Sequence, residues 1–478
     1  MMKKTKILCA ITAALALIAF QSCREIVLLS NEDWAPDVKE GINDLVRLYG
    51  NASEKQYAVF DFDNTTSIFD ITENEMAYQL QTMSFAMPPE RLAEALSTGM
   101  DTEDAGTAGY VADIKAAYGH LYEKFGPFTC EGLSTEVMNS VMEDPYWEEL
   151  ASKAMNMYHY IYKVASPTVC YNWTKYWCCG MTGEQEYELA VRSHRHFSSI
   201  ETTSGQWCGK VESVLGPDPY TYKLGFSVTE PMIELWKTLN ANGIDVWVCS
   251  ASGADAVLAA IDMFGLRPYC SGVLSMTIGH DEEGRYSNFY DYDGLASIPA
   301  EDGSWTKGNL PTGAQTCGQG KVTAILNSIA PLYGGKGPVA CFMDSTGDFN
   351  FCTEFESTKL VVCFNRGNRK VTDGGGIVAI TAIYERDVLG YNLKKANKAG
   401  DILYLLQGRD DNGMRSLRPS NATLTLGATE EKLFAGQENF ALYDSICEHG
   451  LTVKEILETY STSFATDYPG YRSIKDAK

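Results

Sequence analysis

The sequence predicts an α/β fold, in which a parallel sheet covered by helices carries a large, mainly helical insertion after its first strand. Between residues 225 and 390, short apolar segments alternate with helical segments, which is typical of parallel strands joined by crossover helices. A further β-prone segment lies far upstream, at 57–60, and the sequence between the two regions has helical periodicity. Hydrophobic residues form 45% of the chain, which is enough for buried cores.

The first predicted strand, at 57–60, ends in a cluster of polar residues. It is followed at once by Asp-Phe-Asp-Asn-Thr at 61–65. Residues i and i+2 of a strand share a face, so this spacing can bring Asp61 and Asp63 into one pocket.

Residues 70–224 are expected to form a separate, largely helical unit, with helices near 73–82 and 90–96. This unit contains a run of aromatic residues that has two interpretations. They form the core of the unit, or they surround a quaternary ammonium group through cation–π contacts; the residues are Tyr171, Trp173, Tyr176 and Trp177.

The rest of the predicted sheet begins with an amphipathic helix. Apolar residues recur at helical spacing from Met232 to Leu239, with Pro231 near the helix start and Gly243 just past its end. The elements that follow are strand 244–249, helix 255–264, a Gly-, Asp- and Tyr-rich excursion over 275–316, a helix starting near Lys321, and strands 339–343 and 359–364.

Polar residues follow three of the predicted strands. Asp61, Ser250 and Asp344 each stand at the end of an apolar segment. Because ligands of open α/β sheets bind at the carboxyl ends of the strands, we expect these side chains to share one site.

The residue types at these strand ends suit the cleavage of a phosphate monoester. Asp61 can attack phosphorus, Asp63 can protonate the leaving oxygen, and the Lys321 ammonium can neutralise the phosphoryl charge. If Lys321 is instead a solvated residue at a helix start, Lys336 is the alternative phosphate contact. Carboxylates such as Asp344 are the oxygen ligands that Mg²⁺ prefers.

These segments resemble, in order, the four motifs of the haloacid dehalogenase superfamily, and specifically of its aspartate-nucleophile phosphatases. Asp-Asn-Thr-Thr, Ser-Ala-Ser and Asp-Ser-Thr-Gly-Asp look most similar to the phosphoserine and phosphorylcholine phosphatases. The resemblance covers about 55–70 and 225–370. It implies a Rossmann-like catalytic core at 51–69 and 225–390, with residues 70–224 as an inserted cap.

For the site, the resemblance implies that Asp61 is the nucleophile and that Asp63 is the general acid and base. It also implies a Mg²⁺ ion and a bound phosphate. The metal ligands would be Asp61, Asp63 through its backbone carbonyl, Asp344 and Asp348. The phosphate contacts would be Thr65, Ser250, the amide of Ala251, and Lys321.

Two acids after the first motif are candidates for binding the substrate head group. Asp70 lies nine residues beyond the nucleophile, where phosphoserine phosphatases carry an acid that receives the substrate amine, and Glu73 follows it. The alternative is that both are acids favoured at a helix N-terminus by the helix dipole. We expect a small phosphomonoester with a cationic group, such as phosphorylcholine, phosphoethanolamine or a phosphoserine-like compound.

The expected function is therefore that of an exported, Mg²⁺-dependent phosphomonoesterase that works through a phospho-aspartyl intermediate. The alternatives are a surface lipoprotein that binds ligands at a vestigial site, and a phosphotransferase of the same superfamily. The formal net charge of −23 disfavours nucleic acid as a partner.

The N-terminus predicts export. Residues 1–22 combine a Lys-rich start with an apolar run that is short for a membrane span, which is typical of a signal peptide. Gln-Ser-Cys at 21–23 resembles a bacterial lipobox, so Cys23 is expected to carry a lipid and to be the membrane anchor, with ordinary secretion as the alternative. We expect a periplasmic or outer-membrane-attached protein.

Three further expectations concern the remaining chain. Residues 23–50 are expected to be a connecting segment with one helix, and 391–478 form a C-terminal extension that the sequence does not place. An exported protein can form disulfides. The cysteines for which bridges are expected are Cys130, Cys170, Cys178, Cys179 and Cys208.

Overall fold

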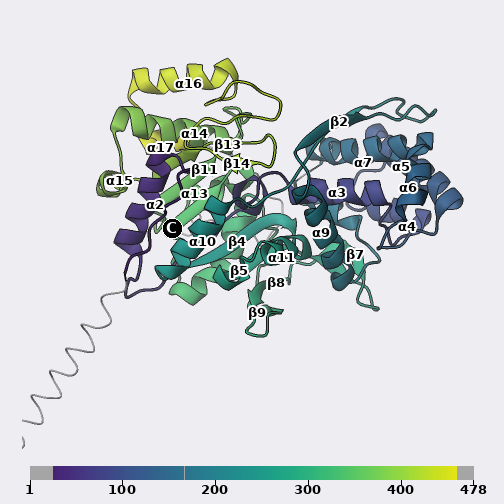
Figure 1. Ribbon diagram of the computed structural model, residues 1–478, viewed down its shortest axis with the longest axis horizontal. Helices are drawn as coiled ribbons and strands as arrows, with labels where there is room; N and C mark the ends of the chain where they lie inside the picture. Colours follow the sequence, from purple (N-terminus) through teal and green to yellow (C-terminus); the bar gives the residue numbers. More distant parts are fainter. Residues whose placement is uncertain (1–24, 166, 460–478) are drawn as a thin grey trace, which may run out of the picture.

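A computed structural model describes residues 25–165 and 167–459 and centres on an eight-stranded sheet (Figure 1). The sheet has the order β12-β11-β10-β1-β4-β5-β8-β9, parallel from β12 to β5 and antiparallel at β8 and β9. This confirms the predicted α/β class. The strands are β1 (Gln56–Phe60), β4 (Ile244–Gly253), β5 (Cys270–Met276), β8 (Leu295–Pro299), β9 (Trp305–Pro311), β10 (Ala340–Met343), β11 (Leu360–Phe364) and β12 (Leu403–Gln407).

Both faces of the sheet are buried, which explains why its central strands are continuous apolar segments. Ala58 and Phe60 of β1 pack into one core, and Tyr57 and Val59 pack into the other. The first core contains residues of α2 (Pro36–Tyr49), α10 (Glu230–Ala241), α11 (Ala254–Met263) and α15 (Leu393–Ala399). The second contains residues of α12 (Gln319–Ala324), α13 (Phe349–Thr353), α14 (Gly374–Tyr384), α16 (Gly436–His449) and α17 (Val453–Thr459).

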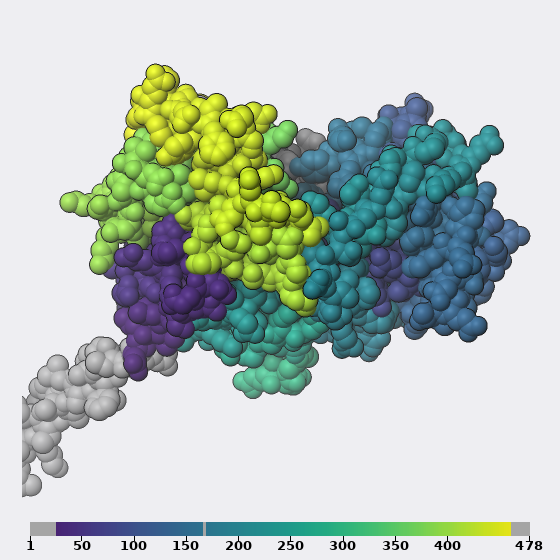
Figure 2. All heavy atoms as spheres, turned by 45° about the horizontal axis from the view of Figure 1, so that its top comes forward, coloured from purple at the N-terminus to yellow at the C-terminus, as the bar shows by residue number. Residues whose placement is uncertain are grey.

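The insertion after β1 is a mainly helical unit that lies beside the sheet and forms a separate lobe in Figure 2. Its helices are α3 (Ile71–Thr82), α4 (Pro89–Leu96), α5 (Ala105–Phe125), α6 (Thr135–Met142), α7 (Pro145–Val164), α8 (Pro167–Tyr176) and α9 (Gly183–Ser198). The unit ends in a hairpin of β2 (Thr203–Trp207) and β3 (Tyr220–Leu224). The chain then returns to the sheet at α10.

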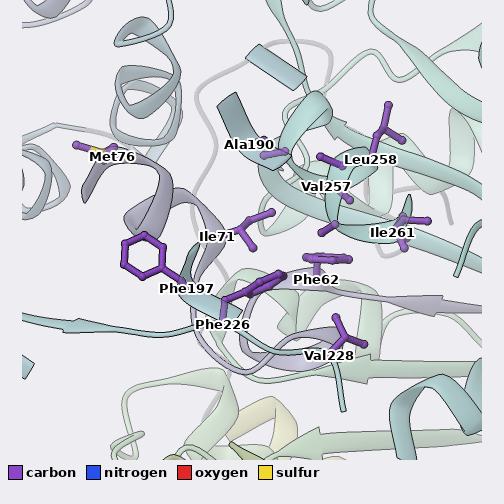
Figure 3. Close-up of a cluster of buried hydrophobic side chains, with 14 of the residues drawn as sticks. Phe62, Ile71, Met76, Ala190, Phe197, Phe226, Val228, Val257, Leu258 and Ile261 are labelled. Carbon is purple, nitrogen blue, oxygen red and sulfur yellow. The ribbon is translucent and has the colours of Figure 1, made fainter. Parts of the chain in front are cut away.

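A cluster of buried apolar side chains joins this insertion to the sheet (Figure 3). Phe62, which follows β1, lies close to Ile71 at the start of α3 and to Val257 and Ile261 of α11. Phe226 contributes from the segment that leads back to α10. The loop between β1 and α3 is thereby held from both sides, which fixes the polar residues that it carries.

The excursion over 275–316 forms strands. Besides β8 and β9, it contains a small antiparallel pair, β6 (Ile278–His280) and β7 (Tyr286–Tyr290). Tyr286 of β7 contacts the insertion, because its amide donates to the carbonyl of Met181 at 2.8 Å.

The C-terminal region belongs in part to the sheet, so the expected core boundary at residue 390 leaves out one of its strands. β12 pairs with β11 in parallel over Leu403–Gln407. The chain then forms a small hairpin of β13 (Arg409–Asp410) and β14 (Ser416–Leu417). In Figure 2 these residues pack beside the N-terminal segment, where the Gln407 amide oxygen accepts from the Ala35 amide at 2.9 Å.

The expectation of disulfides is wrong for the described residues, in which all twelve cysteines are free. Ten of them are buried and pack as small side chains. The Cys170 thiol, for example, donates to the carbonyl of Tyr158 at 3.5 Å, and the Cys178 thiol donates to Glu75 at 3.5 Å.

The predicted signal peptide and Cys23 lie outside the described residues. Within 25–165 and 167–459, no helix is both long enough and apolar enough to cross a membrane.

Candidate functional site

A cavity of about 350 Å³ lies at the carboxyl edge of the sheet, between the sheet and the insertion. The ends of β1 and β10 and the start of α12 form its floor, and residues of α7 and α8 form the opposite wall. The predicted residues that line it are Asp61, Asp63, Asp70, Glu73, Ala251, Lys321, Asp344 and Asp348.

Asp61 occupies the centre of the floor. It follows β1 in extended conformation, and its amide donates to the carbonyl of Phe342 in β10 at 3.0 Å. Its carboxylate Oδ1 accepts from the Lys321 ammonium at 2.6 Å. The side chain is therefore held by the neighbouring strand and by a fixed cation.

Lys321 joins two of the acids. Its ammonium also donates to Asp348 Oδ1 at 2.6 Å, and the residue is 1% exposed. This position excludes the solvated helix-start interpretation. Lys336 is exposed and pairs with Glu54, which precedes β1, so it lies at the opposite edge of the sheet from the cavity.

The loop after β10 places two carboxylates. Asp348 Oδ2 accepts from the amides of Asp344 and Ser345, each at 3.3 Å. Asp344 Oδ2 accepts from Arg366 Nη1 at 3.2 Å and from Arg369 Nη2 at 3.0 Å. Burial raises the pKa of Asp344, but the two guanidinium groups outweigh it and hold that pKa below its ordinary value.

Asp61, Asp344 and Asp348 form a buried acidic group that could hold a metal ion. One carboxylate oxygen of each lies within 4.8 Å of those of the other two. Burial, followed by the charge of Asp348, raises the pKa of Asp61 to about 8. A cation would relieve this repulsion, and an all-oxygen donor set fits Mg²⁺.

Asp63 is oriented differently from Asp61. Its Oδ1 accepts from the Ile71 amide at 2.8 Å, and its Oδ2 accepts from the Ser252 hydroxyl. Burial, followed by the charges of Asp70 and Asp61, raises the pKa of Asp63 well above its ordinary value. A carboxyl group that keeps its proton near neutral pH is suited to protonating a leaving group.

Two of the predicted phosphate contacts do not line the cavity. Ser250 is fully buried, and its hydroxyl accepts from the Ser252 amide at 3.1 Å. The register between β4 and β5 is irregular between Cys249 and Gly253, and within this stretch Ala251 and Ser252 line the cavity. Thr65 is also buried, and Asn64 takes its place in the wall.

Asp70 and Glu73 both line the cavity, and Asp70 also caps α3. Its Oδ1 accepts from the amides of Thr72 at 2.8 Å and of Glu73 at 3.0 Å. The helix-start interpretation is therefore correct for Asp70, and its place in the wall leaves the head-group role available. Burial raises the pKa of Glu73, although the charges of Arg366 and Arg369 oppose this.

Three residues of the aromatic run belong to the core of the insertion, and one faces the cavity. Trp173, Tyr176 and Trp177 are buried in the insertion, where the Trp173 indole donates to the carbonyl of Leu96 at 3.0 Å. Tyr171 alone of the four lines the cavity, together with residues that the sequence analysis missed, namely Tyr158, His159, Tyr162 and Thr174.

Three arginines near the site were also missed. Arg366 and Arg369 follow β11, so the rule that led to Asp61 and Asp344 could have found them. Arg409 follows β12 and is 2% exposed. It donates to Asn64 O at 3.1 Å and to Asn64 Oδ1 at 3.2 Å, and it pairs with Asp411 at 2.8 Å.

Arg409 stabilises an unusual backbone conformation. Asn64, between Asp63 and Thr65, has φ 60° and ψ 3°, in the left-handed region that non-glycine residues seldom adopt. The two hydrogen bonds from Arg409 fix this residue and, through the chain, the carboxylates on either side of the turn. Arg409 is therefore a positioning residue supplied by the C-terminal region.

We expect Arg409→Met to lower kcat about tenfold and to lower the free energy of unfolding by about 3 kcal/mol, because it leaves Asp411 buried without its cation. Steady-state kinetics and urea unfolding measure both effects. Arg418→Met is the matched control, since that partly buried side chain pairs with Glu431 outside the cavity. A wild-type kcat in folded Arg409→Met would contradict the positioning role.

The raised pKa of Asp61 predicts how stability depends on pH without metal. Between about pH 4, where the unfolded carboxyl ionises, and about pH 8, where the folded one does, the folded protein holds a proton that the unfolded chain has lost. The free energy of unfolding therefore falls as pH rises through this window. We expect the Tm in EDTA to fall from pH 5 to pH 8 and Mg²⁺ to reduce the fall. A Tm that rises over this range would contradict the assignment.

A second buried acidic group lies within the insertion. Glu75, Cys178 and Glu186 have possible ligand atoms within 4.8 Å of one another. The Lys175 ammonium pairs with Glu75 at 3.2 Å and with Glu186 at 2.6 Å. This one cation contacts both acids, and no residue of the group lines the cavity at the edge of the sheet.

Comparison with known proteins finds a solved structure that is similar to this chain, but that structure is of a functionally unknown protein. No family model and no curated protein matches the chain. The crystal structure of a conserved functionally unknown protein from Anaerococcus prevotii DSM 20548 is 25% identical, with a TM-score of 0.63 over 84% of this chain and 99% of that chain. The two proteins therefore share a fold that extends over nearly the whole of the Anaerococcus chain.

Two further solved structures are much more distant. A protein with unknown function from Bordetella pertussis Tohama I is 12% identical, with a TM-score of 0.27 over 65% of this chain and 91% of that chain. Cytosolic 5'-nucleotidase IIIB bound to cytidine is 12% identical, with a TM-score of 0.28 over 71% of this chain and 83% of that chain.

Proposed function

We propose that the protein is an exported, Mg²⁺-dependent phosphomonoesterase that hydrolyses small phosphomonoesters through a phospho-aspartyl intermediate. One observation carries the proposal. Asp61, in contact with the buried Lys321 ammonium and grouped with Asp344 and Asp348, lies in the same cavity as Asp63, whose environment favours its protonated form. The resemblance of these segments to the haloacid dehalogenase phosphatases gives further support.

In the first step, a carboxylate oxygen of Asp61 attacks phosphorus and the bond from phosphorus to the ester oxygen breaks. Asp63 gives its proton to that oxygen, so the alcohol leaves neutral. The product is a phosphoryl group on Asp61, and Asp63 is left as a carboxylate.

In the second step, water attacks the phosphoryl group and the bond from phosphorus to Asp61 breaks. Asp63 takes a proton from the attacking water, which restores both carboxyl groups and releases phosphate. The Lys321 ammonium neutralises charge in both steps. Mg²⁺, held by Asp61, Asp344 and Asp348, would supply further positive charge for the phosphoryl oxygens.

Turnover of phosphorylcholine, phosphoethanolamine and O-phosphoserine tests the proposal. We expect phosphate release in Mg²⁺ that EDTA abolishes, and we expect Asp344→Asn to lose it as well. Asp293→Asn is the matched control, because Asp293 lies on an exposed turn after β7. Ligand binding without turnover on a broad phosphoester panel would favour the vestigial binding protein.

The export part of the proposal rests on residues 1–23 and has its own test. In a bacterial host, labelled palmitate is expected to enter the wild-type protein and not Cys23→Ala. An unlabelled protein recovered outside the inner membrane would support ordinary secretion, and a protein retained in the cytoplasm would contradict export.

A further inference from the structure

Arg366 and Arg369 form a pair of cationic side chains on the cavity wall. They follow β11 on a turn that Gly367 permits, with φ 65°. Both side chains are about a quarter exposed, at 25% and 27%, and so face the cavity rather than being sealed in the core. Both hold the Asp344 carboxylate, and the proposed reaction gives neither of them a contact with the substrate.

The C-terminal region holds this turn in place. The Asn365 side-chain amide donates to the carbonyls of Asn421 and Leu433, each at 2.9 Å, and its oxygen accepts from the Gly367 amide at 2.8 Å. The Asn439 amide of α16 donates to the carbonyl of Arg369 at 3.0 Å. The backbone that carries both guanidinium groups is therefore fixed before any ligand binds.

Much of the hydrogen-bonding capacity of the pair is unused. Each guanidinium offers five N–H donors. Asp344 Oδ2 accepts from both groups, and Asp373 Oδ2 accepts from Arg369 Nη1 at 3.3 Å. The Nε atoms of both arginines are buried and have no hydrogen-bond partner among the described residues.

Three acids lie around the pair, and two of them accept hydrogen bonds from it. Asp344 also belongs to the candidate metal group, so its charge is shared with any cation bound there. Glu73 acts on both guanidinium groups through its charge, and Asp373 is half-buried at the start of α14. An anion in the cavity would accept from guanidinium N–H groups that Asp344 and Asp373 do not engage, and such charge-assisted hydrogen bonds are strong and directional.

We propose that Arg366 and Arg369 form a second anion subsite, which binds a carboxylate or a second phosphoryl group of the substrate while Asp61 engages the scissile one. The subsite defines the substrate class of the proposed phosphomonoesterase, and it rests on that proposed function. Because Asp344 contacts both the arginines and the Asp61 group, the two anionic groups must be joined by a short linker. The substrate class is therefore a small phosphomonoester with a neighbouring anionic group, and phosphoserine-like compounds fit it better than phosphorylcholine does.

Matched ligands isolate the second anion. Phosphoglycolate carries a carboxylate next to its phosphomonoester, and ethyl phosphate lacks that carboxylate. We expect kcat/KM for phosphoglycolate to exceed that for ethyl phosphate by at least about tenfold, since charge-assisted hydrogen bonds to a guanidinium contribute about this much. Propane-1,3-diol bisphosphate replaces the carboxylate with a phosphoryl group and shows which anion the subsite prefers.

Replacing the arginines tests the assignment directly. In Arg366→Gln/Arg369→Gln, the preference for phosphoglycolate should disappear. Because both arginines also hold Asp344, kcat/KM for ethyl phosphate is expected to fall as well, so the readout is the ratio of the two kcat/KM values. Arg366→Gln alone should lose part of the preference and serves if the double variant is unstable. Arg47→Gln is the matched control, because that exposed arginine pairs with Asp44 on α2. Equal losses for both ligands would overturn the subsite, as would the absence of a preference in the wild type.

Binding separates the subsite from the catalytic proposal. Asp61→Asn cannot form the phospho-aspartyl group, and calorimetry measures its affinity for the same ligands in Mg²⁺. If Asp61→Asn binds phosphoglycolate more tightly in a way that depends on Arg366 and Arg369, and the wild-type protein shows no turnover, the subsite is upheld and the phosphatase is rejected. Equal binding of the two ligands in an active enzyme would reject the subsite alone.

Discussion

Asp61→Asn is expected to lower phosphoester turnover by about 10⁴-fold or more, the largest effect of any single substitution in this protein. The amide keeps the size of the carboxylate but is not a nucleophile, so the phospho-aspartyl intermediate does not form. Initial rates of phosphate release from O-phosphoserine, in Mg²⁺ and at matched protein concentration, measure the loss.

The controls for Asp61→Asn separate chemistry from folding. Because Asp61 is buried with a raised pKa, a neutral amide at this position should leave the Tm in EDTA unchanged or raise it above pH 7. Asp293→Asn should retain wild-type turnover and Tm. Turnover by Asp61→Asn within tenfold of the wild type would exclude Asp61 as the nucleophile.

Lys321→Met is expected to have the second largest effect, on stability as well as on activity. The substitution leaves Asp61 and Asp348 without the ammonium that each contacts at 2.6 Å. Removing one partner of a buried ion pair costs about 3–5 kcal/mol, and losing a fixed charge beside the reacting group costs about 10²–10³ in kcat. Urea unfolding in EDTA and steady-state kinetics measure the two losses.

Lys336→Met provides the matched control, since Lys336 is an exposed lysine that pairs with Glu54 far from the cavity. We expect that variant to change the free energy of unfolding by less than about 1 kcal/mol. Mg²⁺ should restore part of the stability of Lys321→Met, because it supplies charge to the same carboxylates. A Lys321→Met protein as stable and as active as the wild type would contradict the site.

The sequence was sufficient to predict the α/β class and the residues at the strand ends. A parallel sheet buried on both faces requires continuous apolar strands, so segments such as 57–60 are visible without an alignment. The strand register then determines which residues lie beside Asp61, because Phe60 pairs with Phe342 and with Val248. Asp61 therefore lies level with Met343 at the end of β10 and with Cys249 of β4, one residue before Ser250.

Other features depend on tertiary contacts that local sequence does not encode. Ser250 lies at the predicted strand end, but the register shift between β4 and β5 places Ala251 and Ser252 in the cavity wall in its place. Strand β12 and Arg409 come from a region with no motif, and Arg409 reaches Asn64 across 345 residues of chain. The cysteines show the same limitation, because local sequence does not indicate that all twelve in the described residues are free and that ten of them are buried.

Borohydride trapping followed by peptide mass spectrometry tests the central claim, that Asp61 accepts the phosphoryl group. An aspartyl phosphate is reduced to homoserine, so the protein is mixed with O-phosphoserine and Mg²⁺, quenched within the first turnovers, reduced and digested. The account predicts homoserine at position 61, absent without substrate and absent from Asp61→Asn. Turnover with an unmodified Asp61, or with homoserine at another aspartate, would contradict it.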